Sequence, residues 1–243
     1  MKDNIYLSVI IPAYNEAQRI RETLIKICRY LQEMRYRYEV IVVNDGSQDN
    51  TSDIVRELSK KMPVIKLLEN ATNRGKGYAV CAGVKASQGQ LVLFSDADLS
   101  TPIEELEKLK AALEEEYDIA IGSRGLAGSE IAVRQPWYRE TMGKIFNRLV
   151  RLFAIRGIKD TQCGFKLFRQ TVAKQVFDLQ RIERFAFDVE LLFIARRRRW
   201  KIKEIPIRWI NSPCSRVKLG KDSLKMFFDL FKIRMNAMRG RYN

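Results

Sequence analysis

Two aspartates that follow an apolar run are the residues of this chain best suited to chemistry. Leu91–Ser95 has the composition of a buried strand, and Asp96 and Asp98 come next, one residue apart. Burying a carboxylate beside an apolar core costs free energy, so a compensating partner is expected. Side chains at i and i+2 of an extended segment point to the same side. The two aspartates can therefore bind one divalent cation, Mg²⁺ or Mn²⁺, which in turn holds phosphate oxygens.

The same aspartates have a simpler interpretation as turn or cap residues. Ser100–Glu105 reads as the start of a helix, with a capping serine and a proline close behind it. An isolated Asp-x-Asp is therefore weak support for a metal site, and other segments must decide.

Three further polar segments are expected beside the aspartates. Because the carboxyl ends of parallel strands lie at one edge of a sheet, the segments after the first strands should converge on a single crevice. Glu16 and Asp45 can accept hydrogen bonds from a base or ribose, and Gly46 allows a close backbone approach. The third segment places two cations and two glycines at a helix start, where negative charge binds. The implied ligand is a nucleotide with a diphosphate and a metal. The segments are Pro12-Ala-Tyr-Asn-Glu16, Asn44-Asp-Gly-Ser47 and Asn73-Arg-Gly-Lys-Gly-Tyr78.

The elements that must position these segments alternate between strand and helix. Apolar periodicity predicts strands at 7–11, 38–43, 64–68, 91–94 and 119–122, and helices at 17–35, 49–60, 76–86, 103–116. This alternation is typical of an α/β fold with a mostly parallel sheet flanked by helices. Further on, the pattern predicts a loop at 123–138, helices at 139–153 and 185–197, and strands at 163–168 and 202–209.

The expected organisation is a catalytic domain over 1–220 and a basic amphipathic helix in 221–243. Within the domain, 1–122 is the nucleotide-binding half and 123–220 the acceptor half. The C-terminal helix either packs on the protein's own core or lies on a membrane surface.

Composition removes several classes of chemistry. The 243 residues suffice for one core, and they include no histidine and four scattered cysteines. Histidine-based triads and proton shuttles are thereby excluded, and neither zinc sites nor disulfides are favoured. No stretch reaches the roughly 18 apolar residues of a spanning helix, and no signal peptide is evident. We therefore expect a cytoplasmic protein that is peripheral at the cytoplasmic face of a membrane.

Charge is concentrated in the second half. Residues 1–122 carry 16 Lys+Arg against 19 Asp+Glu, whereas residues 123–243 carry 28 against 10. Such a basic half suits nucleic acid, anionic lipid or phosphorylated substrates. Nucleic acid is disfavoured, because no recognisable module is present and the acidic strand tips would repel a phosphate backbone.

The motifs resemble family 2 inverting glycosyltransferases with the GT-A fold. The resemblance rests on Pro12–Glu16, Asn44–Ser47, Asn73–Gly77 and Asp96–Asp98. The string Asp160-Thr-Gln-Cys-Gly-Phe-Lys-Leu-Phe168, with Phe187-Asp-Val-Glu-Leu-Leu192, is most similar to dolichyl-phosphate β-glucosyltransferases, and mannose synthases are the neighbouring group. The resemblance implies metal-dependent transfer of a hexose to a polyprenyl phosphate, with inversion at the anomeric carbon. The favoured donor is UDP-glucose, so the transferred hexose would be glucose. GDP-mannose as donor and a noncatalytic sugar-nucleotide-binding protein are the alternatives.

The resemblance also implies roles for single residues. Asp98, Arg124 and Arg139 would be catalytic, and Asp96 and Asp98 would hold the metal. Arg139, for which Arg134 is an alternative, would bind the acceptor phosphate with Ser215 and Lys218. The donor would contact Pro12, Tyr14, Glu16, Asp45, Gly46, Ser47, Arg74, Gly75, Lys76, Asp96 and Ala97.

One departure from the family pattern and one chemical property refine this expectation. Mannose synthases often carry a glutamine near the metal, whereas Ser100 and Thr101 stand here, so a third side-chain ligand is left open and a sugar other than mannose is favoured. A lipid phosphate arrives ionised and needs no general base, which agrees with the missing histidine. The cations of 196–203 are expected to face an anionic membrane surface.

Overall fold

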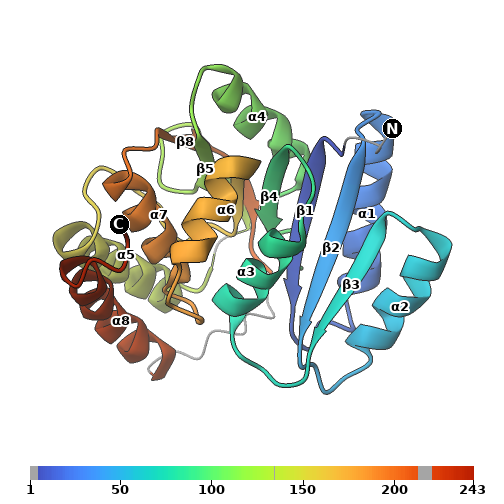
Figure 1. Ribbon diagram of the computed structural model, residues 1–243, viewed down its shortest axis with the longest axis horizontal. Coiled ribbons are helices and arrows are strands. Elements are labelled where there is room, and N and C mark those ends of the chain that lie inside the picture. The colour runs from blue at the N-terminus through green and yellow to red at the C-terminus, as the bar shows by residue number, and fades with distance from the viewer. Residues whose placement is uncertain (1–4, 134, 213–220) are drawn as a thin grey trace.

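The computed structural model describes residues 5–133, 135–212 and 221–243, the side chains of Arg139 and Lys221 apart. Its centre is a seven-stranded sheet in the order β3-β2-β1-β4-β7-β5-β8 (Figure 1). β7 is antiparallel to β4 and β5, and the other neighbours are parallel. The strands are β1 Leu7–Ala13, β2 Tyr38–Asp45, β3 Ile65–Asn70, β4 Leu91–Ser95, β5 Ile119–Ser123, β7 Phe165–Arg169 and β8 Ile202–Pro206.

Helices cover both faces of the sheet, as the alternation of its buried residues requires. Along β1, Val9 and Ile11 pack into one apolar cluster while Ile10 packs into the other. A sheet buried on both faces yields the continuous apolar runs seen in the sequence. Helices α1 Ile20–Glu33, α2 Thr51–Lys61 and α4 Leu106–Glu114, with the short 3₁₀ turn Ile103–Glu105, pack on one face. The other face carries α3 Lys76–Ala86, α5 Trp137–Phe153, α6 Gln170–Leu179, α7 Phe187–Arg197 and α8 Lys221–Met238.

The first half of the chain confirms the predicted α/β fold almost element by element. All five predicted strands and four helices are present, and α3 has the predicted bounds. The parallel strands β1 to β5 end at one edge, so the segments after Ala13, Asp45 and Ser95 are neighbours there.

Two predictions for the second half were wrong, and one helix was missed. The predicted loop 123–138 contains a strand, β6 Glu130–Val133. The predicted strand 202–209 is two strands, because Pro206 has no N–H with which to continue the ladder and the chain then leaves the sheet. The second part, β9 Arg208–Ile210, pairs in parallel with β6. Helix α6 was not predicted; it follows β7 with no intervening loop.

Helices α5 and α8 pack against each other at one end of the molecule (Figure 1). The Phe153 ring of α5 lies 5.3 Å from the Phe231 ring and 6.3 Å from the Phe227 ring of α8. Helix α8 buries Leu230 and Ile233 in the core. It therefore packs on its own core, one of the two arrangements left open by the sequence, and still presents apolar side chains outward. Within the described part of the chain, no helix has the length and apolarity to cross a bilayer.

Candidate functional site

Asp45, at the end of β2, holds the loop that follows β3. Its Oδ1 accepts hydrogen bonds from Asn70 Nδ2 at 2.9 Å and from the backbone N–H of Arg74 at 3.1 Å. Its Oδ2 accepts one from the N–H of Gly75 at 2.7 Å. The side chain is buried, so in this structure it shapes the loop rather than lining the cavity beside it.

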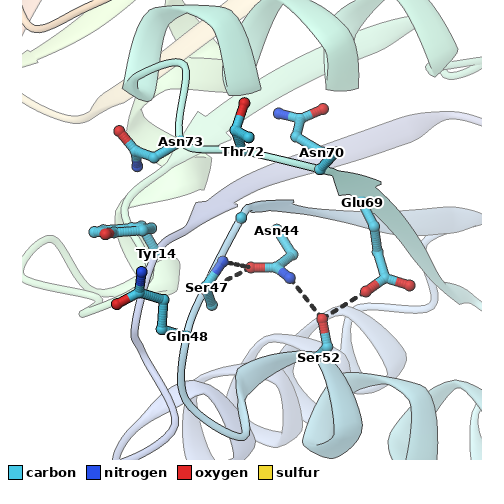
Figure 2. Close-up of a pocket in the computed structure, with 11 residues that line it drawn as sticks. Tyr14, Asn44, Ser47, Gln48, Ser52, Glu69, Asn70, Thr72 and Asn73 are labelled. Carbon is cyan, nitrogen blue, oxygen red and sulfur yellow. Dashed lines mark hydrogen bonds between the residues drawn. The ribbon is translucent and has the colours of Figure 1, made fainter.

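A polar cavity of about 400 Å³ lies at the ends of β1, β2 and β3. Figure 2 shows Asn44 at its centre, bonded to Ser47 and, through Ser52, to Glu69. The volume is in the range of small-molecule sites, and the amide and hydroxyl groups suit a base or a sugar. Of the predicted donor residues, three line the cavity; the full lining is Tyr14, Asn44, Gly46, Ser47, Gln48, Ser52, Glu69, Asn70, Ala71, Thr72 and Asn73.

Gly46 allows the loop after β2 and the loop after β3, which both border this cavity, to approach closely. Gly46 has φ +70°, and a Cβ there would lie 2.6 Å from the carbonyl carbon of Thr72. Only a residue without a side chain fits both demands. The predicted close approach at Gly46 is thus made by the protein's own 72–75 loop.

Arg19 links the tip of β1 to the tip of β4. Its guanidinium pairs with Glu16, donates to Ser212 Oγ at 2.7 Å, and places Nη1 3.9 Å from Asp98 Oδ2. Sequence reasoning missed this residue. Its position three residues after Glu16, where a helix begins, was the available signal.

Asp96 is held by one cation and one glycine. Lys76 Nζ lies 2.6 Å from Asp96 Oδ1, and the backbone N–H of Asp96 donates to the carbonyl of Gly164 at 3.1 Å. A Cβ on Gly164 would lie 2.0 Å from Asp96 Oδ2, so a side chain there would collide with the carboxylate. Burial alone would lower the pKa of Lys76, but the carboxylates of Asp96 and Asp188 raise it above its ordinary value.

The two aspartates do not lie on an extended segment, which corrects that premise. β4 ends at Ser95, and the N–H of Leu99, a residue with φ +46°, donates to the carbonyl of Asp96 at 3.2 Å. Asp98 Oδ1 accepts from the N–H of Ser100 at 2.9 Å, so the turn interpretation also holds. Asp96 is directed to Lys76 and Asp98 to the Arg19 side.

The donor set at this edge fits a hard divalent cation that retains outside ligands. No group of three His, Cys, Asp or Glu residues is placed to hold a metal among the described residues. Mg²⁺ commonly binds through one or two carboxylates and completes its shell with water and substrate phosphate oxygens. Asp98 meets this requirement directly, because its Oδ2 lies too far from Arg19 for a hydrogen bond.

Arg124 is engaged by the carboxylate that opens the Asp160–Phe168 string. Its Nε and Nη2 donate to Asp160 at 2.6 and 2.9 Å, and its backbone N–H donates at 3.1 Å. Burial alone would raise the pKa of Asp160, but Arg124 lowers it below its ordinary value. The guanidinium also lies over the Trp209 ring, 5.4 Å from its centroid. Arg124, predicted as a catalytic residue, is thus held by a partner that sequence reasoning did not assign to it.

Lys166, from the same Asp160–Phe168 segment, is a buried cation next to the site. It is fully buried, with Nζ 2.5 Å from Asp188 Oδ1 and 2.5 Å from the carbonyl of Cys163. The Phe94 ring is 5.1 Å from Lys76 Nζ and 5.6 Å from Lys166 Nζ. Burial raises the pKa of Asp188 despite these cations.

A model of glycosyl transferase family 2 matches residues 8–177. The chain belongs to this family. Curated dolichyl-phosphate beta-glucosyltransferases from Trichomonas vaginalis, Saccharomyces cerevisiae and Homo sapiens are 40%, 37% and 35% identical to it. The matches cover 97%, 99% and 97% of this chain, and 73%, 77% and 77% of those proteins. The predicted enzyme class, glycosyltransferase, is confirmed.

Solved structures of other glycosyltransferases share the fold. Glucosyl-3-phosphoglycerate synthase of Mycobacterium tuberculosis, in complex with Mn²⁺ and UDP-glucose, gives a TM-score of 0.67 at 17% identity, over 97% of this chain and 79% of that one. A mannosyltransferase of Pyrobaculum calidifontis, in complex with GDP-mannose and Mn²⁺, gives 0.62 at 19% identity, over 98% and 65%. The predicted GT-A fold is thereby confirmed.

Of the remaining predicted residues of this family 2 enzyme, some are placed by the structure and the others lie outside the described part of the chain. Arg74 pairs with Glu183 and stacks on Tyr78, and the carbonyl of Ala97 accepts from Thr23 Oγ1 at 2.7 Å. Pro12 lies within β1, beside Val43 of β2. The side chain of Arg139, with Arg134, Ser215 and Lys218, lies outside the described residues.

Proposed function

We propose that this glycosyltransferase transfers glucose from UDP-glucose to a dolichyl-type polyprenyl phosphate, with inversion at the anomeric carbon. The observation that carries the proposal is the 35–40% identity, over 95–99% of the chain, to eight proteins named dolichyl-phosphate beta-glucosyltransferase. Donor and acceptor identities come from those names and from the motifs, and the geometry is compatible with both.

The nucleoside occupies the polar cavity, and the diphosphate extends toward Asp98 and Lys76. Tyr14 and Ser47 border the cavity, while Glu16 and Asp45 shape the strand tips beside it. Asp98, together with Asp96, would hold Mg²⁺ or Mn²⁺, which when bound stabilises the leaving nucleoside diphosphate. Lys76 adds a cation at the start of α3, where backbone N–H groups also favour negative charge.

The acceptor phosphate attacks without a general base. Its oxygen is already anionic near neutral pH, so the side chains have only to bind and orient it. Arg124 is held rigid by Asp160 and by Trp209, and is suited to orient one phosphate oxygen. We propose Arg139, Ser215 and Lys218 as its companions on the acceptor side.

An anionic membrane surface at the cytoplasmic face presents the lipid acceptor to α5 and α8. These helices expose aromatic and aliphatic side chains among cations, the pattern of a helix pair that lies in a lipid interface. The exposed apolar residues include Trp137, Ile145, Leu152, Leu224, Phe228 and Phe231, and the nearby exposed cations include Lys144, Arg148, Arg151, Lys225 and Lys232.

The run Arg196–Arg199 lies beside the ends of these two helices, because Arg196 donates to the carbonyl of Arg156 after α5 and Arg197 donates to Asn243 Oδ1, after α8, at 2.8 Å. It ends α7 and precedes β8, whose first residue Ile202 pairs with Ile119 at the start of β5. The run therefore lies at the sheet edge opposite Asp96, and its neighbours Lys201 and Lys203 pair with Glu116 and Glu115. That these cations face the lipid stays a prediction.

The deciding experiment is a transfer assay with dolichyl phosphate in vesicles and either UDP-glucose or GDP-mannose as donor. We expect metal-dependent turnover with UDP-glucose. Faster turnover with GDP-mannose than with UDP-glucose would show that the transferred sugar is mannose and not glucose. Donor-dependent thermal stabilisation without any turnover would support a noncatalytic sensor, since any ligand that binds only the native state raises its stability.

A further inference from the structure

A buried carboxylate on α7 has no role in the chemistry described above. Glu190 is fully buried, and its Oε2 accepts hydrogen bonds from the backbone N–H groups of Arg181 at 2.9 Å and Ile182 at 2.7 Å. Its Oε1 accepts one from the Tyr242 hydroxyl at 2.5 Å. Tyr242 is itself fully buried, and its hydroxyl also accepts from Asn236 Nδ2 at 3.2 Å. One carboxylate thus joins the end of the described chain to the loop before α7.

That loop packs tightly against the first turn of α3. The backbone N–H of Tyr78 donates to the carbonyl of Glu183 at 2.9 Å. A Cβ on Gly75 would lie 2.6 Å from the same carbonyl oxygen, and one on Gly77 would lie 2.8 Å from the carbonyl oxygen of Ile182. Because the glycines leave no gap, a shift of the loop must move the start of α3.

The residue between these glycines is Lys76, whose ammonium lies 2.6 Å from Asp96 Oδ1. We propose that Glu190, locked by Tyr242, is a positioning residue that fixes Lys76 for donor binding through the 181–184 loop. Lys76 meets the diphosphate in the proposed function, on which this inference rests. The C-terminal segment after α8 is then a structural support of the donor site.

The sharpest variant is Tyr242→Phe, which removes one hydroxyl and keeps the buried ring. We expect faster amide hydrogen exchange at residues 74–78 and 181–184 in the ligand-free protein. We also expect the KM for UDP-glucose to rise about 10-fold, the lower end of the effects seen for supporting partners of a site. Because Lys76 would bind ground state and transition state alike, kcat should change less than about 3-fold.

The matched control is Tyr38→Phe. That hydroxyl donates to the carbonyl of Cys28 at 3.2 Å, and its ring packs in the other apolar cluster, across the sheet from α3. The control should lower the melting temperature without changing exchange at 74–78 or the donor KM. Glu190→Gln keeps an oxygen that accepts from the two loop N–H groups and an amide that donates to the Tyr242 oxygen, so its donor KM should stay within about 3-fold of the wild-type value. Glu190→Leu removes both, so its effect on the donor KM should match or exceed that of Tyr242→Phe.

The proposal is overturned if Tyr242→Phe leaves exchange at 74–78 and the donor KM no different from the Tyr38→Phe control. It is also overturned if both variants loosen residues 74–78 in proportion to their loss of global stability, since a purely structural role predicts that result. Should the wild type fail to use UDP-glucose, the proposed function fails, and exchange in the ligand-free protein still decides the positioning role.

Discussion

At the scale of single residues, Asp96 and Asp98 have different surroundings despite their spacing. Asp96 is bonded to a lysine and sits over Gly164, whereas Asp98 closes a turn and faces Arg19 at a longer distance. In the proposed function, a divalent cation on the diphosphate would therefore be held mainly by Asp98. This difference could not be deduced from the Asp-x-Asp pattern, because it depends on a lysine and a glycine remote in the sequence.

Replacing Asp98 by Asn should lower kcat by about 100-fold or more, because it removes a main electrostatic partner of the departing diphosphate. The amide oxygen can still accept from the Ser100 N–H, so the melting temperature should stay close to that of the wild type. Metal-dependent turnover and thermal unfolding measure the two effects. A variant with normal Mn²⁺-dependent turnover would disprove the assignment.

Gly164→Ala tests the contact that orients Asp96. The added methyl would lie within 2.3 Å of the Asp96 carboxyl carbon, so the carboxylate must move and its pairing with Lys76 must change. We expect about 1–3 kcal/mol of lost stability and about 10-fold weaker donor binding, measured by denaturant unfolding and by titration. Gly143→Ala, where a Cβ meets nothing within 4 Å, is the control.

Asp160 gives a pH dependence with a defined sign. Its pKa is lowered in the folded protein, chiefly by Arg124, so its stabilising effect is complete above the unfolded value of about 4 and is lost as the pH falls below it. Asp160→Asn should cost about 3 kcal/mol near neutral pH, because it leaves the half-buried Arg124 without its partner. It should also flatten the loss of stability below pH 4. Glu57→Gln, in an exposed pair with Arg21, should change little in the same acid titration.

At the scale of elements, local signals decided which predictions succeeded. Helix α3 was predicted with its true bounds because Gly75, with φ +121°, marks its start and the apolar pattern stops before Ser87. The split between β8 and β9 depends on a pairing with β6, a strand that is exposed along its length. An exposed strand lacks the alternating pattern by which sequence reasoning finds strands.

The α5 and α8 surface gives a prediction at this scale. The double variant Leu224→Ser, Phe228→Ser should weaken binding to anionic vesicles by at least about 10-fold, since each large apolar side chain contributes roughly 1.5–3 kcal/mol when buried. Both side chains are more than half exposed, so stability should be retained. Co-sedimentation with vesicles measures the change.

The matched variant for that test is Arg29→Ala, Lys60→Ala, which removes exposed cations of α1 and α2 on the opposite face of the sheet. It should leave vesicle binding nearly unchanged. Equal losses in the two double variants would indicate a diffuse electrostatic attraction and would contradict a specific role for the α5 and α8 surface.

At the scale of the whole molecule, the convergence of the strand ends at one edge of the sheet could be predicted from the sequence. The buried charged residues that pack against these strand ends could not. The parallel order of β1 to β4 follows from the alternation of strands and helices, and it brings Asp45 and Asp96 to one edge. Lys166, Asp188 and Glu190 instead come from the second half of the chain. Their partners are set by tertiary packing, which no local pattern encodes.

The antiparallel strand β7 has a consequence for how the enzyme is assembled. It comes from the second half of the chain, yet it lies between β4 and β5, both of which come from the first. A chain cut between residues 122 and 123 would leave the first fragment with a gap inside its sheet. We expect neither fragment to fold alone and the pair to recover donor binding only when mixed, as circular dichroism and complementation would reveal. Residues 1–122 and 123–243, the halves proposed to bind donor and acceptor, would then fold only together.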